Sequence, residues 1–439
     1  MNMSRNIFNK VSITLLILFS CISAFAQSGA YTGYSPYTVF ALGDIMTQGT
    51  AYNKGMGGVG IATRNRKYIN YLNPASVTAR DTLSFMVDVG LYQNNRIYDQ
   101  NGKKSVNNIC NLNDLVMSFP IYKSSAMMIG LSPYSSTGFS YGSYESDKGL
   151  IGLTGNIYNS ASYRGTISQI FAAAGVTFWR RLSIGVQGIY YFGGLDKSFS
   201  QMFSDTGLAN MNSGYDIDIK GFTGKLGLQY EQPLGSLTLG LGATYTFPAE
   251  MSGTVDYSRV VTSSQEYTLD SRSDTLSTGD LKFANNMGFG ISLRGGENWR
   301  AEINYSRSDW TNTGIEKYIG FTALSRAAVF SASTSQSIRA GFEIIPNMND
   351  GRYYFKRCAY RAGVFYEDSY FLFNGQKVNN FGLTLGMTLP VFRLSNGLSI
   401  GVELGQRGAA VDNMVRERYI NFSIGLNAYD IWFQKHQYQ

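Results

Sequence analysis

Histidine is almost absent from this sequence of 439 residues. The single one, His436, lies close to the carboxyl end. Catalysis by a Ser–His or Cys–His pair therefore lacks its usual proton carrier. A metal site built from several histidines lacks its ligands for the same reason. We therefore expect no enzyme activity, no metal site and no cofactor.

Charge is also scarce, since Asp, Glu, Lys and Arg make up 15% of the chain, against roughly 25% in soluble globular proteins. The 37 basic and 30 acidic residues are interspersed, so the pattern indicates no nucleic-acid partner. No apolar run approaches the ~18 residues that a membrane-spanning helix needs. An ordinary cytosolic enzyme and a helical membrane protein are both excluded.

The first 26 residues have the pattern of an export signal. A short apolar run at 11–19 follows a basic stretch, and an A-x-A cleavage site stands at 24–26. Lipid attachment at Cys21 is the alternative. The mature chain keeps only Cys110 and Cys358, too few for a disulfide scaffold, and we expect both to be unpaired thiols.

From about residue 83 onward, apolar residues alternate with small or polar ones, as in half-buried strands. The clearest strand is 237–247, where apolar residues occupy the odd positions and Thr or Gly most of the even ones. Six further clear segments are 182–192, 287–293, 338–344, 381–389, 398–404 and 420–428. Weaker candidates are 83–92, 112–121, 125–133, 165–178, 215–231, 251–262, 297–307 and 357–368. Together they predict about 14 to 16 strands.

The residue types on the second face of these strands distinguish a membrane barrel from a soluble sandwich. In a sandwich that face meets water and carries many charges, whereas here it is mostly Gly, Ser and Thr. Many segments also reach the length of about 9–11 residues that crosses a bilayer. The sequence therefore predicts an all-β fold, a transmembrane antiparallel β-barrel of about 14 strands at residues 81–439. A secreted soluble β-protein that binds glycans is the alternative.

Sparse charges of both signs lie on the Gly/Ser/Thr face, where they could pair across a narrow polar lumen. These candidates are Asp88, Lys225, Arg300, Glu302, Arg339, Glu343, Arg361, Glu367 and Glu403. The assignment of faces predicts that Leu241→Arg blocks assembly, because arginine in mid-membrane costs roughly 2–4 kcal/mol. It also predicts that Gly242→Ser on the lumen side is tolerated.

Connections of two lengths separate the strands. Long polar connections, expected to face outward, are 94–111, 134–148, 196–214, 262–280 and 309–335. Short ones, expected to be inner turns, are 123–125, 180–181, 233–235 and 393–397. This asymmetry is typical of an outer-membrane barrel with both termini in the periplasm. Aromatic clusters at strand ends, including 178–179, Trp310 and 353–355, are expected to form girdles at the membrane interfaces.

Residues 27–80 show little alternation, yet they are too apolar for a disordered tail. They contain one glycine-rich stretch that formally matches G-x-G-x-x-G, and its glycines are Gly55, Gly57, Gly58 and Gly60. A dinucleotide site would need a strand before this stretch and a helix after it. The flanks at 48–54 and 61–75 provide neither, so we expect tight turns in a compact plug.

This region resembles the amino-terminal part of the FadL/TodX-type outer-membrane transporters for hydrophobic compounds. The resemblance lies in the order of the glycine-rich run 53–62, the step Asn73-Pro74-Ala75 and the first strand, although Ser76 stands where glycine is common. It implies a 14-stranded barrel whose periplasmic side is closed by a hatch, here residues 27–80. It also implies passive uptake of a lipophilic small molecule, with outer-membrane lipid and that ligand as partners.

Two prolines mark a possible exit through the wall. Pro120 and Pro133 flank the short apolar strand 127–131, and proline removes a donor from the ladder. We expect either a lateral gap there or, alternatively, simple strand ends.

A second function belongs to a different class. Some FadL-like barrels resemble this one but are docking subunits of envelope secretion or assembly complexes, and would have envelope proteins as partners. An uptake channel should contain an apolar pocket that buries its ligand, whereas a docking subunit should have a filled lumen.

Overall fold

Strands dominate the structure, a computed structural model that describes residues 33–80, 84–100, 102–204, 208–262, 266–316, 330–391, 397–410 and 414–431. The predicted export signal lies outside these residues. The helices are η1 (Pro36–Val39), α2 (Ala51–Lys54), η2 (Pro74–Ala79), α3 (Lys148–Thr154) and η4 (Tyr354–Arg357). The strands are β1 (Asp44–Ile45), β2 (Ser84–Gln100), β3 (Lys103–Tyr122), β4 (Ser125–Tyr144), β5 (Ile157–Phe178), β6 (Leu182–Phe203), β7 (Asn210–Leu234), β8 (Leu237–Thr246), β9 (Ala249–Thr262), β10 (Glu266–Phe283), β11 (Asn286–Gly295), β12 (Trp299–Asp309), β13 (Phe330–Ala332), β14 (Thr334–Ile344), β15 (Ala359–Phe373), β16 (Gln376–Pro390), β17 (Gly397–Arg407) and β18 (Arg416–Ile431). Among the described residues, no helix has the length and apolarity to cross a membrane.

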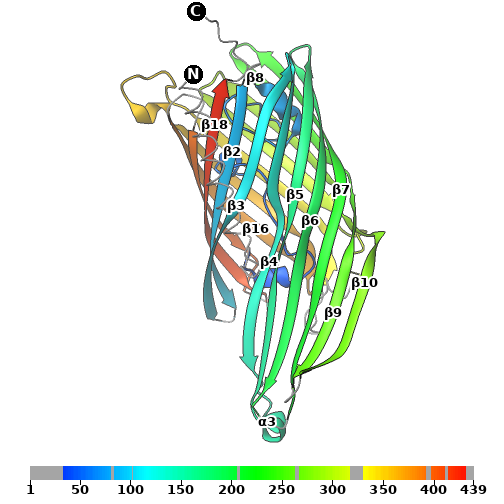
Figure 1. The fold of residues 1–439 in the computed structure, drawn as a ribbon. Coiled ribbons are helices and arrows are strands. Elements are labelled where there is room, and N and C mark those ends of the chain that lie inside the picture. Colours follow the sequence, from blue (N-terminus) through cyan, green and yellow to red (C-terminus); the bar gives the residue numbers. More distant parts are fainter. Residues whose placement is uncertain are drawn as a thin grey trace, which may run out of the picture.

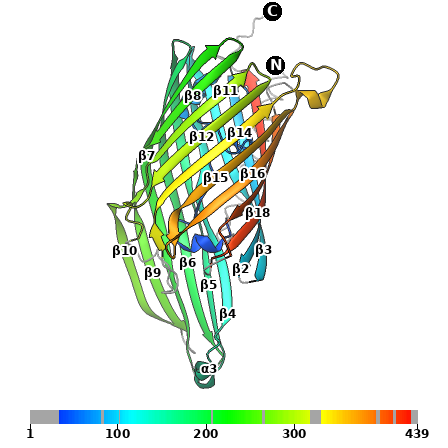
Figure 2. The ribbon, with the colours of Figure 1, turned by 180° about the vertical axis from the view of Figure 1, so that it is seen from behind.

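The wall is one closed antiparallel barrel of 14 strands (Figures 1 and 2). It closes where β18 pairs with β2, with Ile431 opposite Ser84. Three wall strands are interrupted: β8 continues into β9, β10 into β11 and β13 into β14. The prediction of 14 strands is confirmed. The higher counts arise because 237–247 and 251–262 are two halves of one strand, broken at Phe247-Pro248.

The predicted assignment of faces agrees with the exposure of the strands. On β11, Met287, Phe289 and Ile291 point outward and are 42%, 55% and 59% exposed. Their neighbour Gly290 points inward, where an added Cβ would meet the backbone of Ala62. The apolar face of the barrel therefore meets lipid, and the small residues face a filled interior.

One side of the wall is much taller than the other (Figure 1). β5 and β6 have 22 residues each and β7 has 25, about twice the 9–11 that cross a bilayer. The predicted long loops at 94–111, 134–148, 196–214 and 262–280 are wrong, because most of those residues belong to the strands β2, β3, β4, β6, β7 and β10.

The ends of the barrel can be assigned from its connections. The turns at 123–124, 180–181 and 235–236 are short, as predicted, and lie at the end where β2 begins and β18 finishes. Short turns mark the periplasmic end of outer-membrane barrels. The predicted turn at 393–397 falls largely outside the described residues.

One predicted girdle residue, Trp310, lies elsewhere. Trp310 is only 2% exposed and packs inside the barrel against Tyr370, with ring centroids 4.9 Å apart. Residues 353–355 lie in a loop between β14 and β15 rather than at a strand end. Sequence alone misplaced Trp310 because an aromatic residue does not reveal on which side of the wall it lies.

The β5–β6 turn is strained. Trp179 and Arg180 have φ of 47° and 61°, a left-handed region that favours glycine. The turn closes with a hydrogen bond from the Arg181 N–H to the Phe178 carbonyl (3.1 Å). Arg180→Gly should therefore raise the free energy of unfolding by about 1 kcal/mol, measured as a higher urea midpoint in detergent micelles. Arg181→Gly is the matched control and should lower the midpoint; an equal response of both variants would contradict the strain.

Leu241 provides the test of the lipid face. Its side chain is 43% exposed on the outer surface, so Leu241→Arg should cost roughly 2–4 kcal/mol and reduce the amount of folded barrel in outer membranes. Ser306→Arg introduces the same side chain on the lumen face, beside the internal cavity, and should assemble normally. Equal loss of both variants would contradict the assignment of faces.

Candidate functional site: the plugged lumen

A belt of inward-facing glycines lets the hatch backbone touch the barrel wall. On Gly341, Gly363 and Gly386 an added Cβ would lie closer than 3.0 Å to backbone atoms of residues 55–57. Glycine in a strand interior often marks the close approach of another backbone. Gly242 belongs to this belt, because its Cβ would meet the backbone of 61–62. The prediction that Gly242→Ser is tolerated is therefore wrong.

The glycine-rich stretch forms the turn that presses against this belt. Gly57 and Gly58 have φ of +74° and +76°, which only glycine adopts readily. The Gly57 N–H donates to the Thr384 hydroxyl (2.7 Å). Gly55 lies against the wall at Gly386, whereas Gly60 is packed within the hatch. A dinucleotide site would need a strand directly before this stretch, whereas the structure has a single turn of helix, α2, there.

The Asn-Pro-Ala step anchors the hatch on the opposite wall. Asn73 donates from Nδ2 to the carbonyls of Ile61 (2.8 Å) and Leu228 (3.0 Å), and its Oδ1 accepts from the Ala75 N–H. Pro74 opens η2. The wall makes room for this step with glycines 185 and 227, whose added Cβ atoms would meet residues 73–75.

Arg361 and Glu343 form a buried ion pair in the lumen (Nε to Oε2, 2.8 Å). Tyr52 of the hatch joins it, because its hydroxyl donates to Glu343 (3.2 Å) and accepts from Arg300 (3.1 Å). The Arg361 guanidinium also lies 4.1 Å from the centroid of the Tyr52 ring. Three of the predicted lumen charges, Arg300, Glu343 and Arg361, therefore contact one tyrosine of the hatch.

Other predicted lumen residues bind hatch backbone. Glu302 accepts from the Ala62 N–H (2.8 Å), Lys225 donates to the Leu72 carbonyl (2.6 Å), and Arg339 donates to the Gly57 carbonyl (3.1 Å). Arg339 also pairs with Glu367 (2.5 Å). These contacts replace the secondary structure that the hatch lacks.

Glu403 and Asp88 are the remaining two predicted lumen residues, and Glu403 interacts with Lys54 of the hatch. Burial lowers the pKa of Lys54 to about 8, although Glu403 and Asp114 oppose the shift. Its ammonium donates to Asn113. Asp88 is 4% exposed on β2, in register with Val116 of β3.

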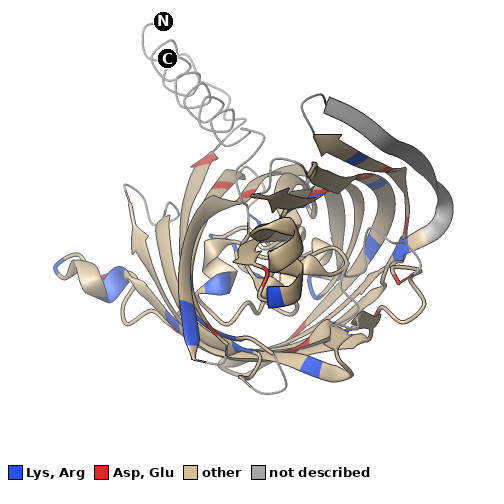
Figure 3. Cartoon of the chain, turned by 90° about the horizontal axis from the view of Figure 1, so that it is seen from below, with Lys and Arg blue, Asp and Glu red and all other residues tan. Residues whose placement is uncertain are grey.

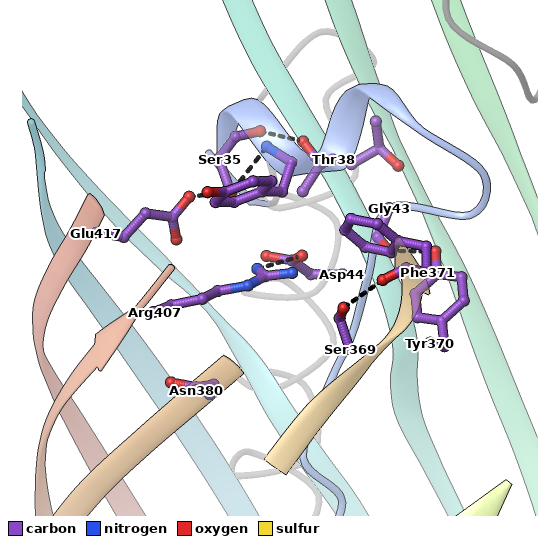
Figure 4. Close-up of polar contacts among 12 residues, drawn as sticks. Ser35, Thr38, Gly43, Asp44, Ser369, Tyr370, Phe371, Asn380, Arg407 and Glu417 are labelled. Atoms are coloured by element: carbon purple, nitrogen blue, oxygen red, sulfur yellow. Dashed lines mark hydrogen bonds and ion pairs between the residues drawn. The ribbon is translucent and has the colours of Figure 1, made fainter. Parts of the chain in front are cut away.

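Ion pairs fasten the outer part of the hatch to the wall, and we call this cluster of Asp44, Arg96, Arg407 and Glu417 the clasp. Figure 4 shows three of its members, Asp44, Arg407 and Glu417. Asp44 accepts from Arg407 (2.6 Å) and Arg96 (3.3 Å), and Arg96 also binds Glu417 (2.8 Å). Ser35 donates to Glu417. Burial alone would raise the pKa of Asp44, but the Arg407 and Arg96 guanidiniums outweigh it and lower that pKa. Asp44 is therefore charged near neutral pH and holds two wall strands.

The hatch also covers an edge of the wall. β3 and β4 pair only from Leu115–Leu131 to the periplasmic end. Beyond that point β1 pairs with β4 at Ser135 and Ser136, and the Ser35 N–H donates to the Gly138 carbonyl (2.8 Å). The hatch thus supplies hydrogen-bond partners for the part of the β4 edge that is not paired with β3.

The two predicted gap prolines lie at different places along this seam. Pro133 lies two residues beyond the last β3–β4 pair, where the two strands separate. Pro120 is paired with Ala126 near the periplasmic turn. The structure thus places only Pro133 beside the separation.

A polar cavity of about 370 Å³ remains between hatch and wall. Its lining combines charged side chains, among them Asp44, Lys54, Arg96, Arg339, Glu367 and Arg407, with apolar ones such as Ile45, Ile61 and Leu72. Most of the aromatic side chains in its lining are tyrosines, including Tyr71, Tyr92 and Tyr134. Within the described residues, no cluster of His, Cys, Asp and Glu is arranged to hold a metal ion.

Sequence reasoning missed the clasp and the role of the lumen glycines. Asp44 and Arg407 are 363 positions apart, and Arg96 lies in a segment predicted as a loop. The recurring inward glycines were a usable signal, because they reported the close approach of a second backbone.

Removing the charge of Asp44 should release the outer part of the hatch. Asp44→Asn leaves Arg407 without its ion-pair partner in the lumen, so amide exchange in residues 33–48 should become faster by about tenfold or more, given ~1.5–3 kcal/mol for a charged hydrogen bond. Hydrogen exchange with mass spectrometry checks this. Asp99→Asn removes the Asp99–Arg416 pair (2.6 Å) and is the matched control, with unchanged exchange in 33–48. Unchanged exchange in Asp44→Asn would contradict the clasp.

Comparison with solved structures shows the fold. The chain is similar to the CymD monoaromatic hydrocarbon channel (15% identity, 89% of this chain and 99% of that one, TM-score 0.58). It is also similar to the Ralstonia pickettii toluene transporter TbuX (14%, 87% and 98%, TM-score 0.59) and the Pseudomonas putida toluene transporter TodX (15%, 90% and 100%, TM-score 0.57). These proteins are channels and transporters rather than enzymes.

The predicted outer-membrane location and FadL-like barrel are confirmed by this likeness and by the closed wall. No curated protein matches the chain. The family described as BamG matches residues 3–439. Since that match spans nearly the whole sequence, the chain belongs to the BamG family.

Proposed function

We propose that this barrel is a docking subunit of an outer-membrane assembly complex. The observation that carries the proposal is the filled lumen. Hatch residues 33–80 touch the wall from the clasp at Asp44 and Glu417 to the Asn73–Pro74 step. A barrel that is plugged by backbone-to-backbone contact offers its outer surfaces, rather than its interior, to other molecules.

The chemistry of the remaining cavity supports the same role. Pockets for small ligands are mostly apolar, with few polar groups. This cavity instead presents Asp44, Arg96, Arg339 and Arg407. These charges already pair with one another or with Glu367, and a hydrophobic molecule placed against charged groups gains no polar contact from them, which is unfavourable. The name of the BamG family points to the same role in an assembly complex.

Uptake of hydrophobic small molecules is the second candidate. It is supported by the fold shared with hydrocarbon channels and by the separation of β3 from β4 beyond Leu115. A lipophilic molecule could leave the wall sideways there, near Pro133, without crossing the charged lumen.

Two measurements separate these functions. Depletion of the chain in cells should lower the amounts of other outer-membrane barrels, and the tagged chain, purified in mild detergent, should carry envelope proteins in fixed ratio. Vesicles that contain the purified chain should take up toluene no faster than empty vesicles, with or without Asp44→Asn. Faster toluene uptake together with unchanged barrel levels after depletion would overturn the docking proposal in favour of uptake.

A further inference from the structure

The connection between β14 and β15, residues 345–358, projects sideways from the periplasmic end of the barrel (Figures 1 and 2). Every other described connection at this end is a short turn. Figure 3 shows its short helix η4 beyond the ring of strands, with basic residues on it. A projection in this direction runs along the membrane surface rather than away from it.

Hydrogen bonds give this loop a fixed shape. The Asp350 carboxylate accepts from the N–H groups of Arg352 (2.8 Å) and Tyr353 (2.7 Å). The Asn347 N–H donates to the Lys356 carbonyl (2.8 Å). The Tyr354 hydroxyl fastens the loop to the wall at the Pro390 carbonyl (2.8 Å). The loop is therefore preorganised.

Three consecutive aromatic side chains are exposed on this loop. Tyr353, Tyr354 and Phe355 are 50%, 39% and 67% exposed. Exposed aromatic rings are common at membrane–water interfaces, where their apolar bodies leave water while polar tips stay near the headgroups. They are unusual on a face that meets only water.

Basic side chains surround these rings. Lys356 lies 4.7 Å and Arg352 5.2 Å from the centroid of the Tyr353 ring, and Arg357 lies 5.2 Å from that of Tyr354. The loop holds three basic residues and one acidic residue, Asp350. Lys356 pairs with Asp350 (3.6 Å), and the loop as a whole keeps a positive charge. The Arg357 Nε is buried and has no partner among the described groups.

The loop begins where the lipid-facing surface ends. Ile344, the last residue of β14, is 43% exposed, and Phe342 before it is also 43% exposed. Trp299 stacks on Phe342 (centroids 6.4 Å apart) at the same end. The aromatic and basic side chains of 352–357 thus continue the apolar wall at the depth where lipid phosphates lie.

We propose that residues 345–358 form a binding site for anionic phospholipid headgroups of the leaflet that faces the periplasm. Phe355 and the tyrosine rings enter the interface, while Arg352 and Lys356 bind the phosphate. The sideways direction and the continuity with the lipid-facing wall favour lipid over a protein partner. This site is independent of whether the barrel docks partners or takes up ligands.

The test uses the full chain, purified and placed in nanodiscs of phosphatidylethanolamine and phosphatidylglycerol. In Phe355→Trp, the added fluorescence should be quenched by phosphatidylglycerol that is brominated close to the headgroup. Leu153→Trp is the control, because Leu153 is 83% exposed on α3 at the outer tip and should not be quenched. An unquenched, water-like emission from Phe355→Trp would overturn the proposal and leave the loop open to solvent or to a protein.

Charge is tested separately by native mass spectrometry of the detergent-purified chain with added phosphatidylglycerol or phosphatidylcholine. The wild type should retain phosphatidylglycerol preferentially, and Arg352→Gln with Lys356→Gln should reduce that retention by about tenfold. Lys103→Gln with Lys104→Gln, exposed at the outer hairpin, is the matched control and should change nothing. Equal retention by both double variants would also overturn the proposal.

Discussion

Direct contact between two backbones is the constraint on which the rest of the structure depends. The hatch backbone can approach the wall backbone this closely only where the wall carries glycine, and the inward glycines at 242, 341, 363 and 386 provide that space. Close packing of this kind leaves no room for an extra methyl group without displacement. The glycines on the inner face of the barrel therefore lie where the hatch backbone contacts the wall, so hatch and wall pack closely together.

A plug with so little regular structure needs partners for its own polar groups. Among the described residues the hatch has only short helical turns and the two-residue strand β1, so many of its backbone groups must bond elsewhere. Glu302, Lys225 and Arg339 of the wall bind hatch N–H and carbonyl groups directly. Charged side chains on the lumen face therefore hold the hatch in place.

Much of this architecture follows from the sequence, because period-two alternation reports which face meets lipid. The outward side chains of Phe289 and Ile291 and the lumen position of Arg361 and Glu343 were predictable on that basis. The clasp was not, because Asp44 meets Arg96 and Arg407 only after the barrel closes. β10 was missed because a strand that rises above the membrane carries no lipid-facing pattern. Trp310 was misplaced because aromatic residues serve equally in an interface and in an internal cluster.

The central claim is that the hatch closes the lumen where residues 55–62 meet the glycine belt, and ion conductance measures this most directly. The full chain, inserted into a planar lipid bilayer, should give no discrete current steps, because neither hydrated ions nor small solutes can pass between residues 55–62 and the glycine belt. Steady, ohmic steps of an open pore from the wild-type chain would contradict the account, since they would require a continuous aqueous path that the contacts of the hatch exclude.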